Sequence, residues 1–200
     1  MAMPTRRAIV CAVTALALPG LALAAPAPAF SGVDLDGRTR SLAEFKGKTV
    51  VLEWVNEGCP YVRKHYGAGS MQATQGLARA DGAVWIQIVS SAPGEQGYFA
   101  SPAKAKAWIA AQKAQPSLML LDPQGQIGRL YKATATPGMV VIDQAGEVVY
   151  RGAIDDKAST RVEDLKTAKN YVRAALADLK AGRPVQAPFS RPYGCAIKYG

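Results

Sequence analysis

Cys59 is the residue whose type and setting point most directly to chemistry. It follows an apolar, β-branched run from Thr49 to Asn56 and the turn Glu57-Gly58, and it immediately precedes Pro60. Proline is favoured in the first turn of a helix, so this order predicts a buried strand, a turn and a helix that begins at Cys59. A helix N-terminus stabilises a thiolate, the form of cysteine that attacks disulfides and peroxides.

Two cations follow Cys59 at a distance of about one helical turn. Arg63 and Lys64 add positive charge that would lower the pKa of the thiol further. The alternative interpretation makes Cys59 a small buried apolar residue that happens to precede a proline. The combination of strand, turn, Cys-Pro and basic helix favours the reactive interpretation.

Residues 1–24 are typical of a secretory signal peptide. A short basic start is followed by an apolar run from Ala8 to Leu18 and by a cleavage site at Ala22-Leu23-Ala24. The apolar run is too short for a stable membrane anchor, and Pro19-Gly20 breaks it. We therefore expect an exported protein, periplasmic or secreted, with the choice between general and twin-arginine export left open.

Removal of this leader leaves two of the three cysteines, Cys59 and Cys195. A free cysteine is a liability in an oxidising compartment, so pairing of the two is the economical assumption. Three interpretations stay open. The pair is a redox couple in which Cys195 resolves an adduct formed at Cys59, or it is a structural disulfide, or the two thiols are independent.

The elements that would position these cysteines form one predicted domain, residues 25–182, followed by a tail, residues 183–200, that carries Cys195. The predicted strands are 49–56, 84–89, 118–121, 139–143 and 147–152, and the predicted helices are 60–65, 70–80, 102–113, 127–132 and 160–181. Alternating strands and helices, then a hairpin and a closing helix, predict an α/β fold of the thioredoxin type. Its central mixed sheet would be flanked by helices.

Three separated motifs carry a resemblance to a known family. They are Trp54 to Tyr66, Tyr150 to Asp156, and Pro192 to Tyr199. Together with Thr136-Pro137 before an apolar strand, they resemble the exported thioredoxin-like redoxins of the thiol-specific antioxidant and alkyl hydroperoxide reductase (peroxiredoxin-like) family. The resemblance covers essentially the whole chain after the leader.

The resemblance implies that Pro137 is cis and that its loop lies beside Cys59. Thr136 would then offer backbone groups to a bound thiol or peptide, and we expect Pro60, Asn56 and Trp54 to complete the thiol pocket. Arg63, Lys64 or Arg129 would supply the positive charge that tunes the thiol pKa.

Two departures from related patterns bear on the reaction. A dithiol thioredoxin has a second cysteine three residues after the first, where this chain has Val62. A typical peroxiredoxin has proline and threonine seven and three residues before its cysteine, where this chain has Leu52 and Asn56. The preferred hypothesis is therefore a thiol-disulfide oxidoreductase with Cys59 as nucleophile and Cys195 as resolving or disulfide partner.

Two alternative functions use the same residues. One is a peroxiredoxin-like thiol peroxidase, and the other is a redox-inert thioredoxin-fold binding protein stapled by a structural disulfide between Cys59 and Cys195. The expected partners are a thiol or disulfide protein, or a peroxide, and an external thiol reductant. The oligomeric state is left open.

Other chemistry finds little support in the sequence. His65, the only histidine, lies six residues after Cys59, so neither a Cys-His pair nor a metal site is expected. No phosphate-binding or nucleotide motif is present, and we expect no cofactor. The net charge of +9 comes from scattered basic residues, which favours a solvated surface over nucleic-acid binding. Asp155-Asp156 is interpreted as a solvated turn.

Overall fold

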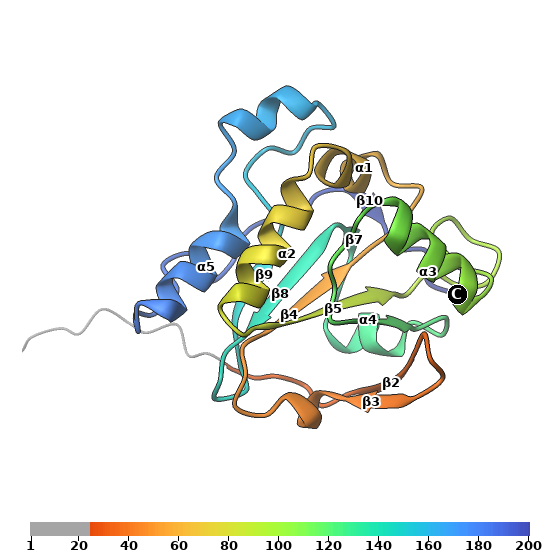
Figure 1. Ribbon diagram of the computed structural model, residues 1–200, viewed down its shortest axis with the longest axis horizontal. Coiled ribbons are helices and arrows are strands. Elements are labelled where there is room, and N and C mark those ends of the chain that lie inside the picture. Colours follow the sequence, from red (N-terminus) through yellow and green to blue (C-terminus); the bar gives the residue numbers. More distant parts are fainter. Residues whose placement is uncertain (1–24) are drawn as a thin grey trace, which may run out of the picture.

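The apolar runs of the chain form the centre of a mixed eight-stranded sheet (Figure 1). The computed structural model describes residues 25–200, and the predicted signal peptide lies outside them. In spatial order the strands are β1 (Ala25–Pro26), β9 (Glu147–Gly152), β8 (Gly138–Ile142), β4 (Val50–Trp54), β5 (Val84–Val89), β6 (Leu118–Leu121), β2 (Ser31–Asp34) and β3 (Thr39–Ser41). Strands β4, β5 and β6 are parallel, and β8 is antiparallel to β4. The predicted α/β class with a mixed sheet is confirmed.

Five α-helices and two 3₁₀ helices are present in residues 25–200. They are η1 (Leu42–Phe45), α1 (Pro60–Gly67), α2 (Ser70–Ala80), α3 (Pro102–Ala111), α4 (Gln126–Leu130), η2 (Val162–Lys166) and α5 (Tyr171–Lys180). The predicted interruption between α1 and α2 falls at Gly69, whose φ of 72° lies in the left-handed region. Glycine reaches this region without steric cost, so the chain can end one helix and start the next.

The predicted closing helix, residues 160–181, is wrong in its first half. The structure has the short η2 and then a separate α5 that begins after Asn170. The side chain of Asn170 caps α5 by accepting a hydrogen bond from the Arg173 N–H at 2.9 Å. Asn170 also forms an isolated bridge with Asp155, so tertiary contact fixes the break.

Strand β4 and Val55, the residue that follows it, divide their side chains between two apolar cores. Val51 and Val55 pack into a core that includes residues of α1, α2, α3 and α5. Val50, Leu52 and Trp54 face the other core, which includes residues of α4 and of the C-terminal end. This alternation follows from the two-residue period of a strand that is covered on both faces.

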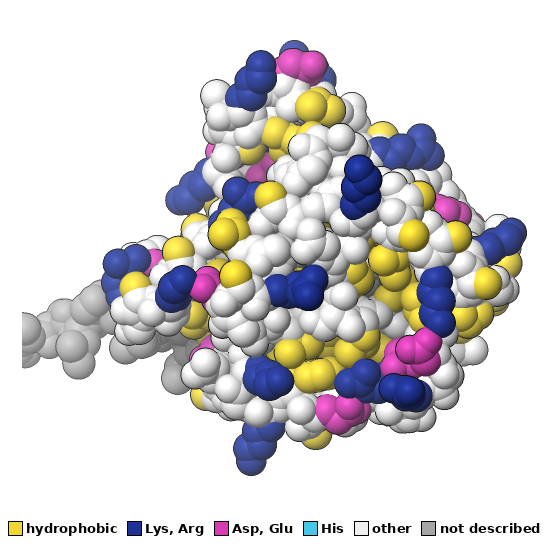
Figure 2. Space-filling view, viewed as in Figure 1, with side chains coloured by type: hydrophobic (Ala, Val, Ile, Leu, Met, Phe, Trp, Pro, Cys, Tyr) yellow, Lys and Arg dark blue, Asp and Glu magenta, His cyan; other side chains and the backbone are white. Residues whose placement is uncertain are grey.

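The surface shows how the positive charge is distributed. Figure 2 shows Lys and Arg side chains spread over the visible face, with Asp and Glu side chains among them. Within residues 25–200, no helix combines the length and the apolar character needed to span a membrane.

Candidate functional site: two thiols at one loop

Cys59 lies in the turn between β4 and α1, directly before the first residue of α1. The Asn56 side-chain oxygen accepts a hydrogen bond from the Gly58 N–H at 2.8 Å, and the Asn56 carbonyl oxygen accepts one from the Cys59 N–H at 3.1 Å. This turn makes Cys59 the N-cap residue of α1, with Pro60 as the first helical residue. The local prediction, in which the cysteine stands at a helix N-terminus, is confirmed.

The Cys59 sulfur faces the loop before β8. The Cys59 side chain is 0% exposed, and in its protonated form the thiol donates a hydrogen bond to the Thr136 carbonyl oxygen at 3.2 Å. The peptide bond between Thr136 and Pro137 is cis, as expected, and both residues are buried. The loop therefore lies directly beside the sulfur atom.

The C-terminal tail reaches the same loop from the other side. Strand β10 (Cys195–Ala196) pairs with β7 (Ala135–Thr136) in antiparallel register, which places Cys195 opposite Thr136. The two short strands lie beside the start of α1 in Figure 1. A Cβ on Gly194 would stand 2.0 Å from the Thr136 carbonyl oxygen, so this close approach requires glycine.

Thr136 thus stands between two cysteines, both of which are free thiols in this structure. Its carbonyl oxygen contacts the Cys59 sulfur, and its hydroxyl donates to the Cys195 carbonyl oxygen at 3.4 Å. Cys59 and Cys195 are separated by most of the chain in sequence, but the tertiary structure brings both into contact with Thr136.

The pKa values of the two thiols are shifted in opposite directions. Burial raises the pKa of Cys59, but hydrogen bonds from the side chains of Cys195 and Thr136 and from the Val62 backbone outweigh burial, so the net pKa lies below its ordinary value. Burial, then the hydrogen bond and the charge of Cys59, raises the pKa of Cys195 to about 12. Of the two thiols, Cys59 is therefore the one that ionises first.

Among the predicted tuning cations, Arg63 lies near the pair. Its guanidinium donates to the Glu57 and Gly58 carbonyl oxygens at 3.3 and 3.2 Å, which ties it to the turn before Cys59. The positive charges of Lys198 and Arg63 oppose the increase in the pKa of Cys195. Lys198 was not among the predicted residues, because only the folded position of the tail brings its charge near the pair.

Arg129 is engaged at the C-terminus. Its guanidinium donates to the Gln124 carbonyl oxygen and to the Gly200 oxygen, both at 2.5 Å, and lies over the Tyr199 ring at 4.7 Å. None of these contacts involves a cysteine. The structure thus brings Arg63 to the pair and uses Arg129 to hold the end of the tail.

Lys64 points into the protein and joins a buried polar cluster. Its ammonium donates to the Lys157 carbonyl oxygen at 2.9 Å and lies 3.9 Å from Asp155. Burial lowers the pKa of Lys64, and the negative charges of Asp155 and Asp164 oppose that shift. Lys64 therefore serves this cluster, whereas the charges that act on Cys195 come from Lys198 and Arg63.

Asp155 is the centre of this cluster, and the prediction of a solvated turn is wrong for it. The carboxyl is 2% exposed, accepts hydrogen bonds from the Lys157 N–H at 2.9 Å and from the Tyr193 hydroxyl, and lies 3.5 Å from the His65 ring. Burial lowers the pKa of His65 to about 4, against the attraction of Asp155. The neighbouring Asp156 is exposed, as a turn residue would be.

Trp54 and Asn56 support the site without contacting the sulfur atoms through their side chains. The Trp54 ring lies in the core on the other face of β4, where its N–H donates to the Ser90 hydroxyl at 3.2 Å. Asn56 forms the turn before Cys59, and its amide nitrogen donates to the Gln96 carbonyl oxygen at 3.4 Å. Trp54 is thus outside the predicted thiol pocket.

Sequence reasoning missed a second buried carboxyl, Glu53. It is 0% exposed and accepts hydrogen bonds from Tyr66, Trp85, Gln75 and Gln87 at 2.7 to 3.2 Å. Burial raises the pKa of Glu53, and these hydrogen bonds act in the opposite direction. The sequence could have indicated this buried carboxyl, because Glu53 is a single charged residue inside an apolar strand.

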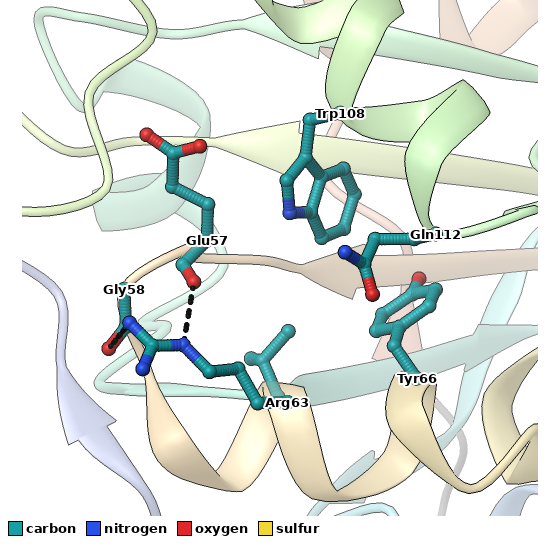
Figure 3. A pocket seen from close by; sticks show the side chains of 7 residues that line it. Glu57, Gly58, Arg63, Tyr66, Trp108 and Gln112 are labelled. Carbon is teal, nitrogen blue, oxygen red and sulfur yellow. Dashed lines mark hydrogen bonds between the residues drawn. The ribbon is translucent and has the colours of Figure 1, made fainter.

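A cavity of about 330 Å³ lies beside the first turns of α1. Figure 3 shows Arg63 on the α1 side with its hydrogen bonds to Glu57 and Gly58. Across the cavity lie Trp108 of α3 and Gln112, which directly follows α3. The cavity is lined by the aromatic side chains of Tyr66 and Trp108 and by the charged residues Glu57 and Arg63, next to the helix that Cys59 caps. In residues 25–200, His, Cys, Asp and Glu side chains form no group of three that could hold a metal ion.

The sheet order, the cis proline loop and the helix capped by Cys59 define a thioredoxin-like α/β protein. The chain belongs to the redoxin family, whose family model matches residues 22–169. Among the curated proteins, none matches the chain.

Solved structures share this fold over most of the chain. An uncharacterized conserved protein from Geobacillus kaustophilus is 25% identical with a TM-score of 0.73, covering 89% of this chain and 92% of its own. A hypothetical protein from Sinorhizobium meliloti is 22% identical with a TM-score of 0.72, covering 91% and 97%. The thioredoxin domain of a thiol-disulfide oxidoreductase from Bacteroides vulgatus is 22% identical with a TM-score of 0.52, covering 74% and 98%.

Proposed function

We propose that this protein is an exported thiol-disulfide oxidoreductase whose redox couple is Cys59 and Cys195. The observation that carries the proposal is the position of Thr136, which contacts the sulfur of Cys59 and pairs in β-register with Cys195. Val62 occupies the position at which a dithiol thioredoxin has its second cysteine. The tail supplies the missing sulfur by placing Cys195 beside Cys59. The partners are protein thiols or disulfides and an external thiol reductant.

The couple can exchange two electrons with such partners. In its dithiol form the pair loses two protons and two electrons as the bond between Cys59 and Cys195 forms, and a partner disulfide is reduced to two thiols. In the reverse direction a partner dithiol is oxidised, and the bond between Cys59 and Cys195 is cleaved. The low pKa of Cys59 makes it both the better-ionised nucleophile and the better leaving group of the two.

Peroxide reduction by the same cysteines is the competing reaction, and the geometry favours it less. The Asn56 side chain stands where a peroxiredoxin has threonine, but it bonds to the Gly58 N–H and the Gln96 carbonyl oxygen. Within the described residues, the hydrogen bonds to the Cys59 side chain come from Cys195, Thr136 and backbone groups. No side-chain cation takes part in them.

Export is the cellular part of the proposal and rests on residues 1–24. Their basic start, apolar run and small-residue cleavage site support removal of the leader, which would give a mature domain of residues 25–182 and a tail of residues 183–200. N-terminal sequencing of the protein recovered from outside the cytoplasm tests this directly. A chain that still begins at Met1 would contradict it.

The experiment that tests the reaction is a thiol count combined with two turnover assays. Alkylation and mass measurement of the folded protein, before and after a mild thiol reductant, show whether a bond between Cys59 and Cys195 forms and opens. Turnover is then measured with a protein disulfide and, separately, with hydrogen peroxide. A pair that cycles with the protein disulfide supports the proposal, whereas faster peroxide turnover contradicts it. A bond that resists the reductant favours a structural disulfide.

A further inference from the structure

The two cysteines differ in exposure. The Cys59 side chain is 0% exposed, whereas Cys195 is partly exposed at the end of the tail. We propose that an external thiol meets the oxidised couple at the Cys195 sulfur, while Cys59 acts as the buried leaving group. This inference rests on the proposed redox function and identifies the sulfur that meets the partner.

The tail before Cys195 is fixed to the body by Tyr193. Its hydroxyl donates to the buried carboxyl of Asp155, and its ring lies 5.6 Å from the Tyr61 ring and 5.5 Å from the Lys64 ammonium. Tyr61 and Lys64 both belong to α1, the helix that Cys59 caps. One contact region therefore joins the helix of one cysteine to the tail of the other.

The tail after Cys195 is fixed as well. The Tyr199 hydroxyl donates to the Ala133 carbonyl oxygen at 2.7 Å, and the Ala92 N–H donates to the Lys198 carbonyl oxygen at 2.8 Å. The Ile197 side chain is buried in the second core. Because Cys195 lies between two anchored segments, the tail covers Cys59, and a partner would have to break several contacts to reach that sulfur.

The exchange step at Cys195 is chemically balanced. In the oxidised couple, a partner thiolate attacks the Cys195 sulfur, a bond forms between the partner and Cys195, and the bond to Cys59 breaks with Cys59 leaving as thiolate. A second thiol of the partner loses its proton and attacks the partner sulfur of this mixed disulfide. Cys195 then leaves and takes up a proton, so the partner dithiol is oxidised and the couple reduced.

The surroundings of the pair suit this direction of attack. Thiolate attack on a disulfide is in line, so a nucleophile arriving from solvent at Cys195 expels the sulfur on the opposite, buried side, which is Cys59. The lowered pKa of Cys59 makes it the faster leaving group. The charges of Lys198 and Arg63 act on Cys195 and attract an anionic thiolate.

The test uses the full-length variants Cys59→Ser and Cys195→Ser, each with oxidised glutathione as the probe. Formation of the mixed disulfide with glutathione is followed by mass at the remaining cysteine, and digestion separates any adduct at Cys11. Rates are extrapolated to high pH, where each thiol is ionised, so that access is compared without differences in pKa. Cys195 in the first variant should react about tenfold faster or more than Cys59 in the second.

A second comparison tests the role of the anchored tail. Tyr193→Phe, placed in the Cys195→Ser background, removes the hydrogen bond to Asp155 and should raise the Cys59 rate several-fold, since hydrogen bonds to a charged group are among the stronger ones. Tyr131→Phe is the matched control. It removes a tyrosine hydroxyl that donates to the Pro28 carbonyl oxygen at 2.7 Å, a bond that involves neither the tail nor α1, and should leave the rate unchanged.

A third measurement needs no substitution. The oxidised wild-type protein is treated with a thiol and quenched in acid, and the first adduct should be found on the Cys195 peptide. If Cys59 reacts as fast as Cys195, or the first adduct is on Cys59, the inference is overturned and the redox couple stands. If the wild-type protein forms no bond between Cys59 and Cys195, the proposed function fails and the inference fails with it.

Discussion

The start of α1 and the C-terminal tail each supply one sulfur atom, and they are built in different ways. Cys59 is placed by neighbours within a few residues, through the turn at Asn56 and the first turn of the helix. Cys195 is placed by distant partners, with Tyr193 bonded to Asp155 and the backbone of β10 paired to β7. The first region places a thiol at the start of a helix by local geometry, and the second brings a high-pKa thiol beside it by tertiary contact.

This difference assigns complementary roles. A thiol that ionises easily but is covered by other atoms can act on a sulfur that is already in place, whereas a partly exposed sulfur is the one that an external thiol can reach. The largest increases in the pKa of Cys195 come from burial and from the hydrogen bond and charge of Cys59.

The largest expected effect comes from removing either sulfur. Cys59→Ser or Cys195→Ser should lower the rate of turnover with a protein disulfide by at least about 100-fold, because neither cysteine alone can complete a two-electron exchange. Turnover is measured with an excess of external thiol. Ala177→Ser, at an exposed position of α5, is the control and should keep the wild-type rate. Full turnover by Cys195→Ser would show that the tail is not part of the couple.

The next largest effect is on the pH dependence of stability, and it comes from His65 in the contact region between α1 and the tail. Its pKa of about 4 in the folded protein lies below the ordinary value of 6.5, so the unfolded chain binds a proton first and stability is lost as the pH falls from 6.5 towards 4. Lys64, Asp155 and Tyr193 face the same cluster. We expect a loss of about 2 kcal/mol between pH 7 and pH 5.

The measurement is urea unfolding at the two pH values for the wild type and for His65→Gln. Carboxyl groups titrate in both proteins, so the contribution of His65 is the difference between the two pH dependences. The variant should lose about 2 kcal/mol less than the wild type on acidification. Equal losses would mean that His65 is protonated in the folded protein at pH 5.

The electrostatic dependence of Cys195 on Cys59 gives a smaller effect. Cys59→Ser removes a neighbouring thiolate, so the pKa of Cys195 should fall from about 12 by about one unit or more. The pH dependence of iodoacetamide labelling at Cys195 measures this. An unchanged profile would show that burial alone sets the acidity of Cys195, and the comparison between the two regions would lose its electrostatic part.

The smallest effect separates the two arginines. Arg63→Ala should raise the pKa of Cys195 by a few tenths of a unit, because an exposed charge is largely screened. Arg129→Ala should leave the pKa of both cysteines unchanged, because its contacts are with Gln124, Tyr199 and Gly200. Labelling rates at several pH values distinguish the two. A larger effect of Arg129→Ala would show that anchoring the chain end matters more than charge near the sulfur.

Local patterns in the sequence predicted the fold well. The apolar runs predicted the central strands, Pro60 the start of α1, and the glycines after His65 the break before α2. They failed for residues 160–181, where a helical pattern continues through Asn170 but a contact with Asp155 ends it. A local sequence pattern indicates which secondary structure a segment can form. It does not indicate which distant residue will interrupt that structure.

Several members of the site were beyond the reach of such patterns. Asp155 looked like a turn residue because its neighbour Asp156 is one, yet Lys64, His65 and Tyr193 surround its carboxyl. Arg129 and Lys64 looked like tuning cations because only their charge was visible. Which side of an element a charged group faces depends on packing that involves segments far apart in the chain.

The sequence by itself determined the α/β class, the position of Cys59 at a helix N-terminus and the absence of a second cysteine beside it, because these follow from local periodicity and spacing. Only the tertiary structure decided that Cys195 lies opposite Thr136, that Cys59 is covered and Cys195 partly exposed, and that the two thiols differ in acidity. The physical reason is that burial, hydrogen bonding and charge at a sulfur atom are set by whatever the folded chain places around it.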